Sequence, residues 1–151
     1  MEFPITELLG HENSTEWILK HFHPKGLQCP KCKKSVEQSR KFRRTQTSEL
    51  VVHRCYNCDT IYNLYTGTIF QGSQWTVMQV VLLMRGICKG ETTRELAAEL
   101  GLSYKTVLVM RHKVQHNAEL EQPNTPLPDS HSETDEMFQN AGEKRCTSSR
   151  S

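Results

Sequence analysis

The 151-residue chain is 36% hydrophobic and 24% charged and carries a formal net charge of +2, which is typical of one ordinary globular domain or two very small ones. No run approaches the roughly 20 apolar residues that a bilayer crossing requires, so we expect no membrane partner. The first residues lack a basic segment followed by an apolar core, so they do not form a secretory signal. We therefore expect a cytoplasmic protein whose thiols stay reduced.

Positive charge is concentrated in the front part of the chain. Residues 1–70 contain 10 Lys/Arg and 7 Asp/Glu, residues 71–117 contain 6 and 3, and residues 118–151 contain 3 and 7. Within the first part, residues 25–54 contain 9 basic and 2 acidic side chains. A charged face is often simply solvated, but this asymmetry favours a polyanion as the partner of the front half.

The N-terminal segment, residues 1–24, contains a short predicted helix. Asn13 or Ser14 is the expected N-cap, Trp17 belongs to the apolar side, and Pro24 lies beyond the end. The next segment, residues 25–70, is rich in β-branched and aromatic residues in "LVVHRC" and "TIYNLYTGTIF", which predict strands.

Two C-x2-C pairs, "CPKC" and "CYNC", lie 22 residues apart in this second segment. In a reducing compartment such pairs more often bind metal than form disulfides. Two turns of this kind supply the four thiolates of a tetrahedral Zn²⁺ site, and four protein ligands leave no open position for a substrate. We predict a zinc ribbon with a structural zinc ion held by four ligands: Cys29, Cys32, Cys55 and Cys58.

Three histidines near this segment are weaker candidates. His53 adjoins the second cysteine pair, but four thiolates already complete the site, so we expect a strand residue. His21 and His23, in "KHFHP", lie far from any cysteine or carboxylate cluster and are interpreted as surface or packing residues.

Residues 71–117 predict three helices that end in a helix-turn-helix. An apolar helix in "QWTVMQVVLLMRGICKG" comes first. Thr92 or Thr93 can cap the second helix, Gly101 ends it, and Ser103 caps the third, which buries Val107 on one side. A plain helix–glycine–helix packing unit is the alternative interpretation. A helix-turn-helix would place its last helix in the DNA major groove.

The candidate DNA contacts fall into two sets. Residues at the start of the last helix would face base edges, and they are Ser103, Tyr104, Lys105 and Thr106. Cations would contact phosphates: Arg111 and Lys113 on that helix, and Lys33, Lys34, Arg43 and Arg44 in the ribbon, where Lys31, Arg40 and Lys41 extend the basic stretch.

The motifs "CPKC", "HRCYNC", "YTGTIF", "ELAAELGLSYKTVLVMRHKV" and "TDEMFQNAGEK", in this order, resemble the N-terminal part of insertion-sequence transposases with a zinc ribbon and an ISXO-type catalytic domain. The resemblance implies double-stranded DNA at the element's terminal inverted repeats as partner, and a DDE nuclease domain that binds Mg²⁺ in a full-length member. It implies that Asp135 is the first catalytic carboxylate. Self-association and association with a full-length transposase are further expectations.

The resemblance also predicts the organisation of the rear of the chain. Residues 118–134 contain three prolines and form the expected linker, and residues 135–151 would be the truncated start of the nuclease domain, in a disordered acidic tail. A chain with only this carboxylate would lack autonomous catalysis. Two alternatives stay open: a transposon-derived DNA-binding regulator, and a zinc-ribbon module that docks on proteins of the transcription machinery. The predicted fold class is α+β.

Overall fold

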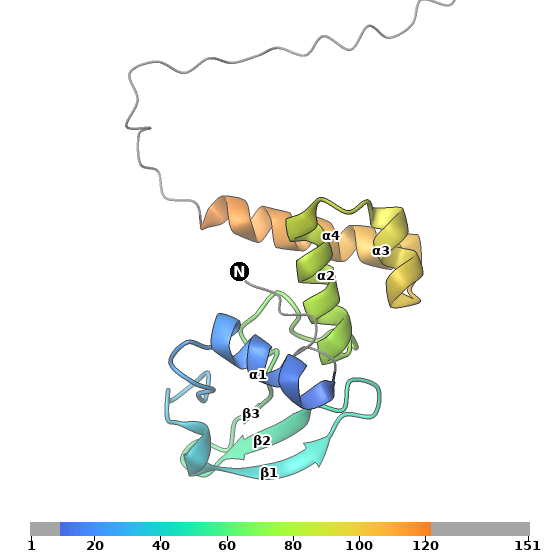
Figure 1. Cartoon of the computed structure of the whole chain (residues 1–151). Coiled ribbons are helices and arrows are strands. Elements are labelled where there is room, and N and C mark those ends of the chain that lie inside the picture. Colours follow the sequence, from blue (N-terminus) through green and yellow to red (C-terminus); the bar gives the residue numbers. More distant parts are fainter. Residues whose placement is uncertain (1–9, 122–151) are drawn as a thin grey trace, which may run out of the picture.

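A computed structural model describes residues 10–121, which form an α+β fold, as predicted (Figure 1). A three-stranded sheet lies at one end, α1 packs beside it, and α2 leads to α3 and α4 at the other end. The elements are α1 His11–Phe22, a 3-10 helix Val36–Gln38, β1 Ser39–Arg44, β2 Val51–Cys55, β3 Ile61–Tyr62, α2 Val77–Lys89, α3 Thr93–Leu100 and α4 Tyr104–Leu120. Most of the predicted linker, and the acidic tail, lie outside the described residues.

Helix α1 begins earlier than the sequence predicted. Gly10 occupies the N-cap position without a side-chain cap, and the helix starts at His11. The prediction that Asn13 or Ser14 caps this helix was wrong, because Ser14 is fully buried within the first turns and its N–H donates to the Gly10 carbonyl. The predicted apolar side is confirmed, since Trp17 and Ile18 are both buried.

The sheet is antiparallel, with strand order β1-β2-β3. β2 covers the predicted strand, and β1 pairs along its full length with a bulge between Lys41 and Arg43. The second predicted strand was mostly wrong, because only Ile61 and Tyr62 of "TIYNLYTGTIF" pair with β2.

Side-chain hydrogen bonds turn the chain away from the sheet after Tyr62. The Asn63 Oδ1 accepts the Tyr65 N–H at 2.9 Å, and the Thr66 hydroxyl accepts the Asn63 N–H at 2.9 Å. Gly67 then has a φ of 78°, a value that glycine adopts without strain. Asn and Thr side chains that bond to nearby backbone in this way compete with strand pairing.

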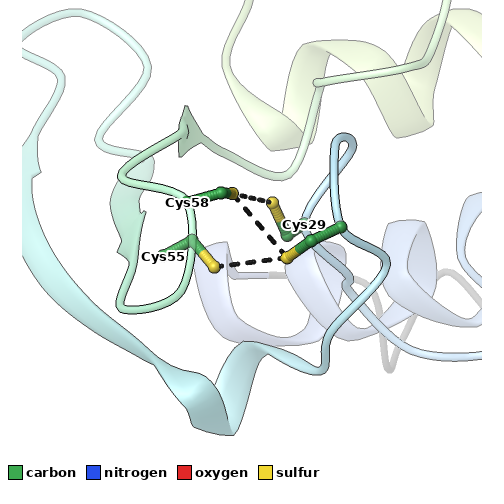
Figure 2. A group of neighbouring side chains, drawn as sticks. Cys29, Cys55 and Cys58 are labelled. Carbon is green, nitrogen blue, oxygen red and sulfur yellow. Dashed lines mark hydrogen bonds between the residues drawn. The ribbon is translucent and has the colours of Figure 1, made fainter.

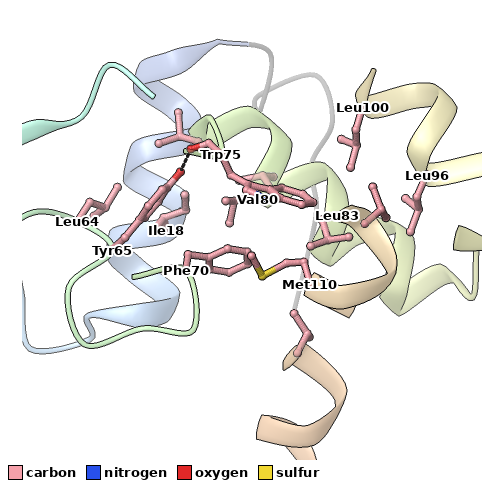
Figure 3. Close-up of a cluster of buried hydrophobic side chains, with 14 of the residues drawn as sticks. Ile18, Leu64, Tyr65, Phe70, Trp75, Val80, Leu83, Leu96, Leu100 and Met110 are labelled. Atoms are coloured by element: carbon pink, nitrogen blue, oxygen red, sulfur yellow. Dashed lines mark hydrogen bonds between the residues drawn. The ribbon is translucent and has the colours of Figure 1, made fainter. Parts of the chain in front are cut away.

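One hydrophobic core joins the ribbon segment to the helices (Figure 3). It contains Ile18 from α1, Tyr65 and Phe70 from the turns, and Leu83 and Leu96 from α2 and α3. The buried Tyr65 hydroxyl donates to the Trp75 carbonyl at 2.8 Å, and burial raises the pKa of this phenol. Core residues on the two sides of position 70 therefore pack in a single cluster.

The helix termini carry the predicted signals. The Thr92 hydroxyl accepts the Glu95 N–H at the start of α3, and Gly101, at φ 64°, ends it. Ser103 caps α4 by accepting the Thr106 N–H, and Val107 is buried on the inner side of α4. α4 continues to Leu120, beyond residue 117, where the linker was expected. No helix within residues 10–121 is long and apolar enough to cross a membrane.

Gly86 allows α2 and α3 to approach closely. A Cβ built at this position would overlap the Leu96 side chain and come 2.8 Å from the Glu91 Oε2. Overpacking of this kind costs about 1–3 kcal/mol. We expect Gly86→Ala to lower the free energy of unfolding by that amount in urea denaturation, although alanine is the better helix former. Ala98→Gly on the exposed side of α3 is the control, with an expected loss of about 1 kcal/mol from helix propensity alone. A Gly86→Ala protein as stable as the parent would contradict the close approach.

Candidate metal centre and nucleic-acid interface

The first cysteine pair forms a tight turn that aims both sulfurs to one side. The Lys33 N–H donates to the Cys29 carbonyl, and the Cys29 N–H donates to the Lys34 carbonyl, both at 2.9 Å. Lys33 adopts a φ of 61°, in the left-handed region that the turn requires. The Lys34 Nζ also donates to the Asn57 Oδ1 at 3.3 Å, which links this turn to the second one.

The second pair repeats the same backbone arrangement. The Asp59 N–H donates to the Cys55 carbonyl at 3.1 Å, and the Cys55 N–H donates to the Thr60 carbonyl at 3.0 Å. Asp59 has a φ of 57°, matching Lys33 at the equivalent position. The two turns are thus built alike, and each holds its cysteines by backbone bonds rather than by side-chain packing alone.

The four thiols converge on one point (Figure 2). The Sγ–Sγ distance is 3.4 Å between Cys29 and Cys58, 3.5 Å between Cys32 and Cys55, and 3.7 Å between Cys32 and Cys58, and all four sulfurs lie within 4.8 Å of one another. Zn–S bonds of about 2.3 Å place tetrahedral sulfurs about 3.8 Å apart. The four predicted ligands can therefore hold a metal ion, and their spacing and chemistry fit Zn²⁺.

The surroundings of the cluster favour thiolate ligands. Hydrogen bonds from the side chain and backbone of Thr60 lower the pKa of the Cys58 thiol to about 6, and the Thr60 Oγ1 lies 3.2 Å from the Cys58 Sγ. A metal-binding cysteine must be deprotonated, so a low pKa assists binding near neutral pH. Thr60 had not been recognised from the sequence, although it follows the second pair by two residues, as Lys34 follows the first.

The histidines have structural roles. His53 lies on β2 outside the thiol cluster, stacks on Tyr62 at 5.7 Å, and has its pKa lowered by burial and by the charge of Lys41. A His21 ring nitrogen lies 2.8 Å from the Trp17 carbonyl, and a His23 ring nitrogen lies 2.7 Å from the Leu64 carbonyl. All three therefore pack or bridge elements, as the sequence indicated.

The residues at the start of α4 that were predicted to face base edges differ in their hydrogen bonds. Tyr104 is 53% exposed, and Lys105 beside it is also exposed. The hydroxyls of Ser103 and Thr106 lie 2.7 Å apart, and Ser103 caps the helix, so these two side chains are engaged with each other and with backbone. All four side chains are exposed, but only Ser103 and Thr106 are bonded to each other.

Arg111 has a structural contact that the sequence did not indicate. Its Nη1 donates to the Glu91 carbonyl at 2.6 Å and lies 3.4 Å from the Thr93 Oγ1. The guanidinium thereby holds the loop between α2 and α3 against α4. Lys113, by contrast, is exposed one residue after His112 and is available to solvent.

The ribbon cations lie on the surface in two places. Lys33 and Lys34 are exposed at the first cysteine turn, and Arg43 and Arg44 are exposed at the end of β1. The predicted catalytic residue Asp135 lies outside the described residues.

The chain is similar in sequence to a protein of a transposable element. It is 27% identical over 143 residues to an uncharacterized protein in transposable element ISH50 of Halobacterium salinarum. The match covers 93% of this chain and 46% of that protein, so the chain spans less than half the length of this relative. No family model and no solved structure matches the chain. The chain is thus a distant homologue of a protein encoded in an insertion element.

Proposed function

We propose that this chain is the DNA-binding portion of an insertion-sequence transposase and that it binds the terminal inverted repeats of its element. The observation that carries the proposal is the start of α4. There, Tyr104 and Lys105 are exposed at the N-terminal end of a helix whose opposite side is buried against α3. A helix-turn-helix presents its second helix to base edges through these same first residues.

Two further features support the proposal. The turn between α3 and α4 consists of residues 101–103 and contains a glycine in the left-handed conformation, as helix-turn-helix units do. The relative is an uncharacterized protein in transposable element ISH50, which supports a role for this chain in an insertion element.

We propose that zinc is a structural cofactor of DNA binding. We also propose that the start of α4 and the ribbon surface contact DNA in different ways. Tyr104 and Lys105 would select the sequence, whereas the ribbon cations Lys33, Lys34, Arg43 and Arg44 would contact phosphates without reading sequence. Lys113 would add a phosphate contact beside the bases, and Arg111 would act through the position of the helices.

Catalysis would depend on residues other than those proposed to bind DNA. By the family resemblance, Asp135 would be one ligand of a pair of Mg²⁺ ions that activate the attacking oxygen and stabilise the leaving oxygen. Each hard cation takes about six oxygen ligands, so Asp135 would act only together with further carboxylates. DNA binding through the ribbon and α4 requires none of these carboxylates.

The division of labour predicts two distinct mutant phenotypes. We expect Lys105→Ala to change the order of preference among duplexes, because it removes a contact to base edges. We expect Arg43→Ala/Arg44→Ala to weaken binding to every duplex, with a salt-dependence slope that falls by about 2 because two phosphate contacts are lost. Fluorescence anisotropy of the zinc-loaded chain with inverted-repeat and scrambled duplexes, over a range of salt concentrations, measures both effects.

Lys20→Ala is the control, since this exposed cation of α1 belongs to neither surface. Identical behaviour of the Lys105 and Arg43/Arg44 variants would contradict the division of labour. Failure of the zinc-loaded chain to bind any duplex would contradict the proposed function and favour a protein-interaction module. Duplex binding that blocks an intact transposase at the same ends would instead identify a regulator.

A further inference from the structure

The sheet has one side that faces away from α1. Val51 and His53 of β2 line a pocket together with α1 residues, so they face α1. Side chains alternate along a strand, which turns Arg54 to the opposite side. Arg40 on β1 and Ile61 on β3 are the direct cross-strand partners of Arg54 and share its side. We call this side, with Phe42, the outer face of the sheet.

Phe42 stands out on the outer face. It is the extra residue of the bulge between Lys41 and Arg43, and 47% of its surface is exposed. A bulge re-aims a side chain, and here the Phe42 ring lies over the Arg54 guanidinium, with Cζ 5.9 Å from the ring centroid. Asp59 fixes this guanidinium in turn, because its Oδ1 lies 2.9 Å from the Arg54 Nε.

The charge around Phe42 indicates the chemistry of its partner. β1 carries no acidic residue, and two of its exposed cations, Arg40 and Arg43, lie on the outer face, whereas Lys41 and Arg44 pair with His53 and Val51 on the side of α1. The relevant cations are thus Arg40 and Arg43. An apolar protein surface that covered Phe42 would have to desolvate these cations without neutralising them. A nucleic-acid strand would instead place phosphates beside the cations while a base contacts the ring.

The exposed ring further restricts which form of nucleic acid fits. In a duplex the base faces are hidden in the stack, and only base edges and phosphates are accessible. An aromatic ring beside an arginine can gain binding energy by stacking on the π-face of a base only where that base is unpaired. We propose that Phe42 and Arg54 form a stacking platform for an unpaired base of a DNA strand that Arg40 and Arg43 hold by its phosphates.

This platform rests on the proposed DNA-binding function and extends it to a second form of DNA. The α4 residues would hold duplex and the outer face of the sheet would hold a single-stranded segment, with Arg43 serving as a phosphate contact for either form. The two activities use different side chains, Lys105 for one and Phe42 for the other. Variants can therefore separate them.

The test measures binding of the zinc-loaded full chain to two fluorescent probes, a short oligothymidine strand and a blunt duplex. Loss of base stacking corresponds to about a 5- to 150-fold weaker affinity. We expect Phe42→Ala to weaken oligothymidine binding within that range and to change duplex binding less than about twofold, since stacking on exposed bases is absent from the duplex. Phe42→Trp should retain oligothymidine binding.

Phe42→Leu is the matched control, because it keeps apolar bulk and removes the π-face; we expect nearly the same loss as for alanine. Zinc content and far-UV circular dichroism of each variant establish that the fold is intact. Equal oligothymidine binding by the parent chain and Phe42→Ala, no oligothymidine binding by the parent chain, or an equal loss on both probes would overturn the platform. Phe42-dependent oligothymidine binding without duplex binding would overturn the proposed function and leave the platform standing.

Discussion

Replacement of Cys29 by serine is expected to abolish zinc binding and to unfold the ribbon. Cys29 is fully buried, and its Sγ lies 3.4 Å from that of Cys58, so a serine would leave an incomplete site in an enclosed position. Structural zinc sites contribute about 10–16 kcal/mol of apparent binding free energy in zinc-finger peptides. This is as large as the whole stability of a typical domain, about 5–15 kcal/mol.

The loss should extend beyond the cysteine turns. Leu50 and Leu64, on the ribbon side, belong to the same core as α1 and α2, so unfolding of the ribbon removes part of the support of the helices. Metal analysis is expected to show one zinc ion for each parent chain and almost none for Cys29→Ser. Circular dichroism and limited proteolysis should show that the segment of residues 25–70 is unfolded. Duplex binding should be lost as well.

Cys88→Ser is the matched control for this experiment. Cys88 is an exposed cysteine on α2 that lies outside the thiol cluster, so its replacement should leave zinc content and fold unchanged. Treatment of the parent chain with a strong chelator should reproduce the Cys29→Ser phenotype. A folded Cys29→Ser protein with unchanged zinc content would show that the cluster is not the metal site.

Phe70→Ala is expected to be the most destabilising substitution in the apolar core. Phe70 is fully buried and its ring lies 6.0 Å from that of Phe22, 5.9 Å from that of Tyr65 and 6.4 Å from that of Trp75. Truncation of a buried phenylalanine to alanine costs about 3–5 kcal/mol, because both apolar burial and packing are lost. Urea denaturation of the zinc-loaded chain, followed by tryptophan fluorescence, measures this change.

Phe42→Ala provides the comparison, since it removes the same phenyl group from a partly exposed position on the surface instead of from the core. We expect it to change the free energy of unfolding by no more than about 0.5 kcal/mol. A loss below about 1 kcal/mol for Phe70→Ala would mean that the aromatic cluster does not connect the ribbon to the helices as the structure shows.

The sequence alone determined the features that depend on local chemistry. The four-cysteine cluster follows from the C-x2-C spacing, because two residues between cysteines suffice for a turn that aims both sulfurs to one side. The boundaries of α3 follow from Thr92 and Gly101, because a hydroxyl cap and a left-handed residue act on the backbone of their own turn. The burial of Val107 follows from helical spacing.

Only the tertiary structure decided the features that depend on partners distant in the chain. "SRKFRR" has no apolar alternation, and it forms β1 because β2 supplies its hydrogen bonds; its pairing then places Phe42 on the outer face of the sheet. Nothing in the sequence around Arg111, a predicted phosphate contact, indicates a partner within the chain, but Glu91, twenty residues earlier, supplies a carbonyl for it. In "TIYNLYTGTIF" the β-branched and aromatic residues predicted a strand, yet Phe70 enters a core that residues of α1 and α2 complete. Short-range hydrogen bonds can be inferred from neighbouring residues, whereas strand pairing and burial depend on what the rest of the chain brings alongside.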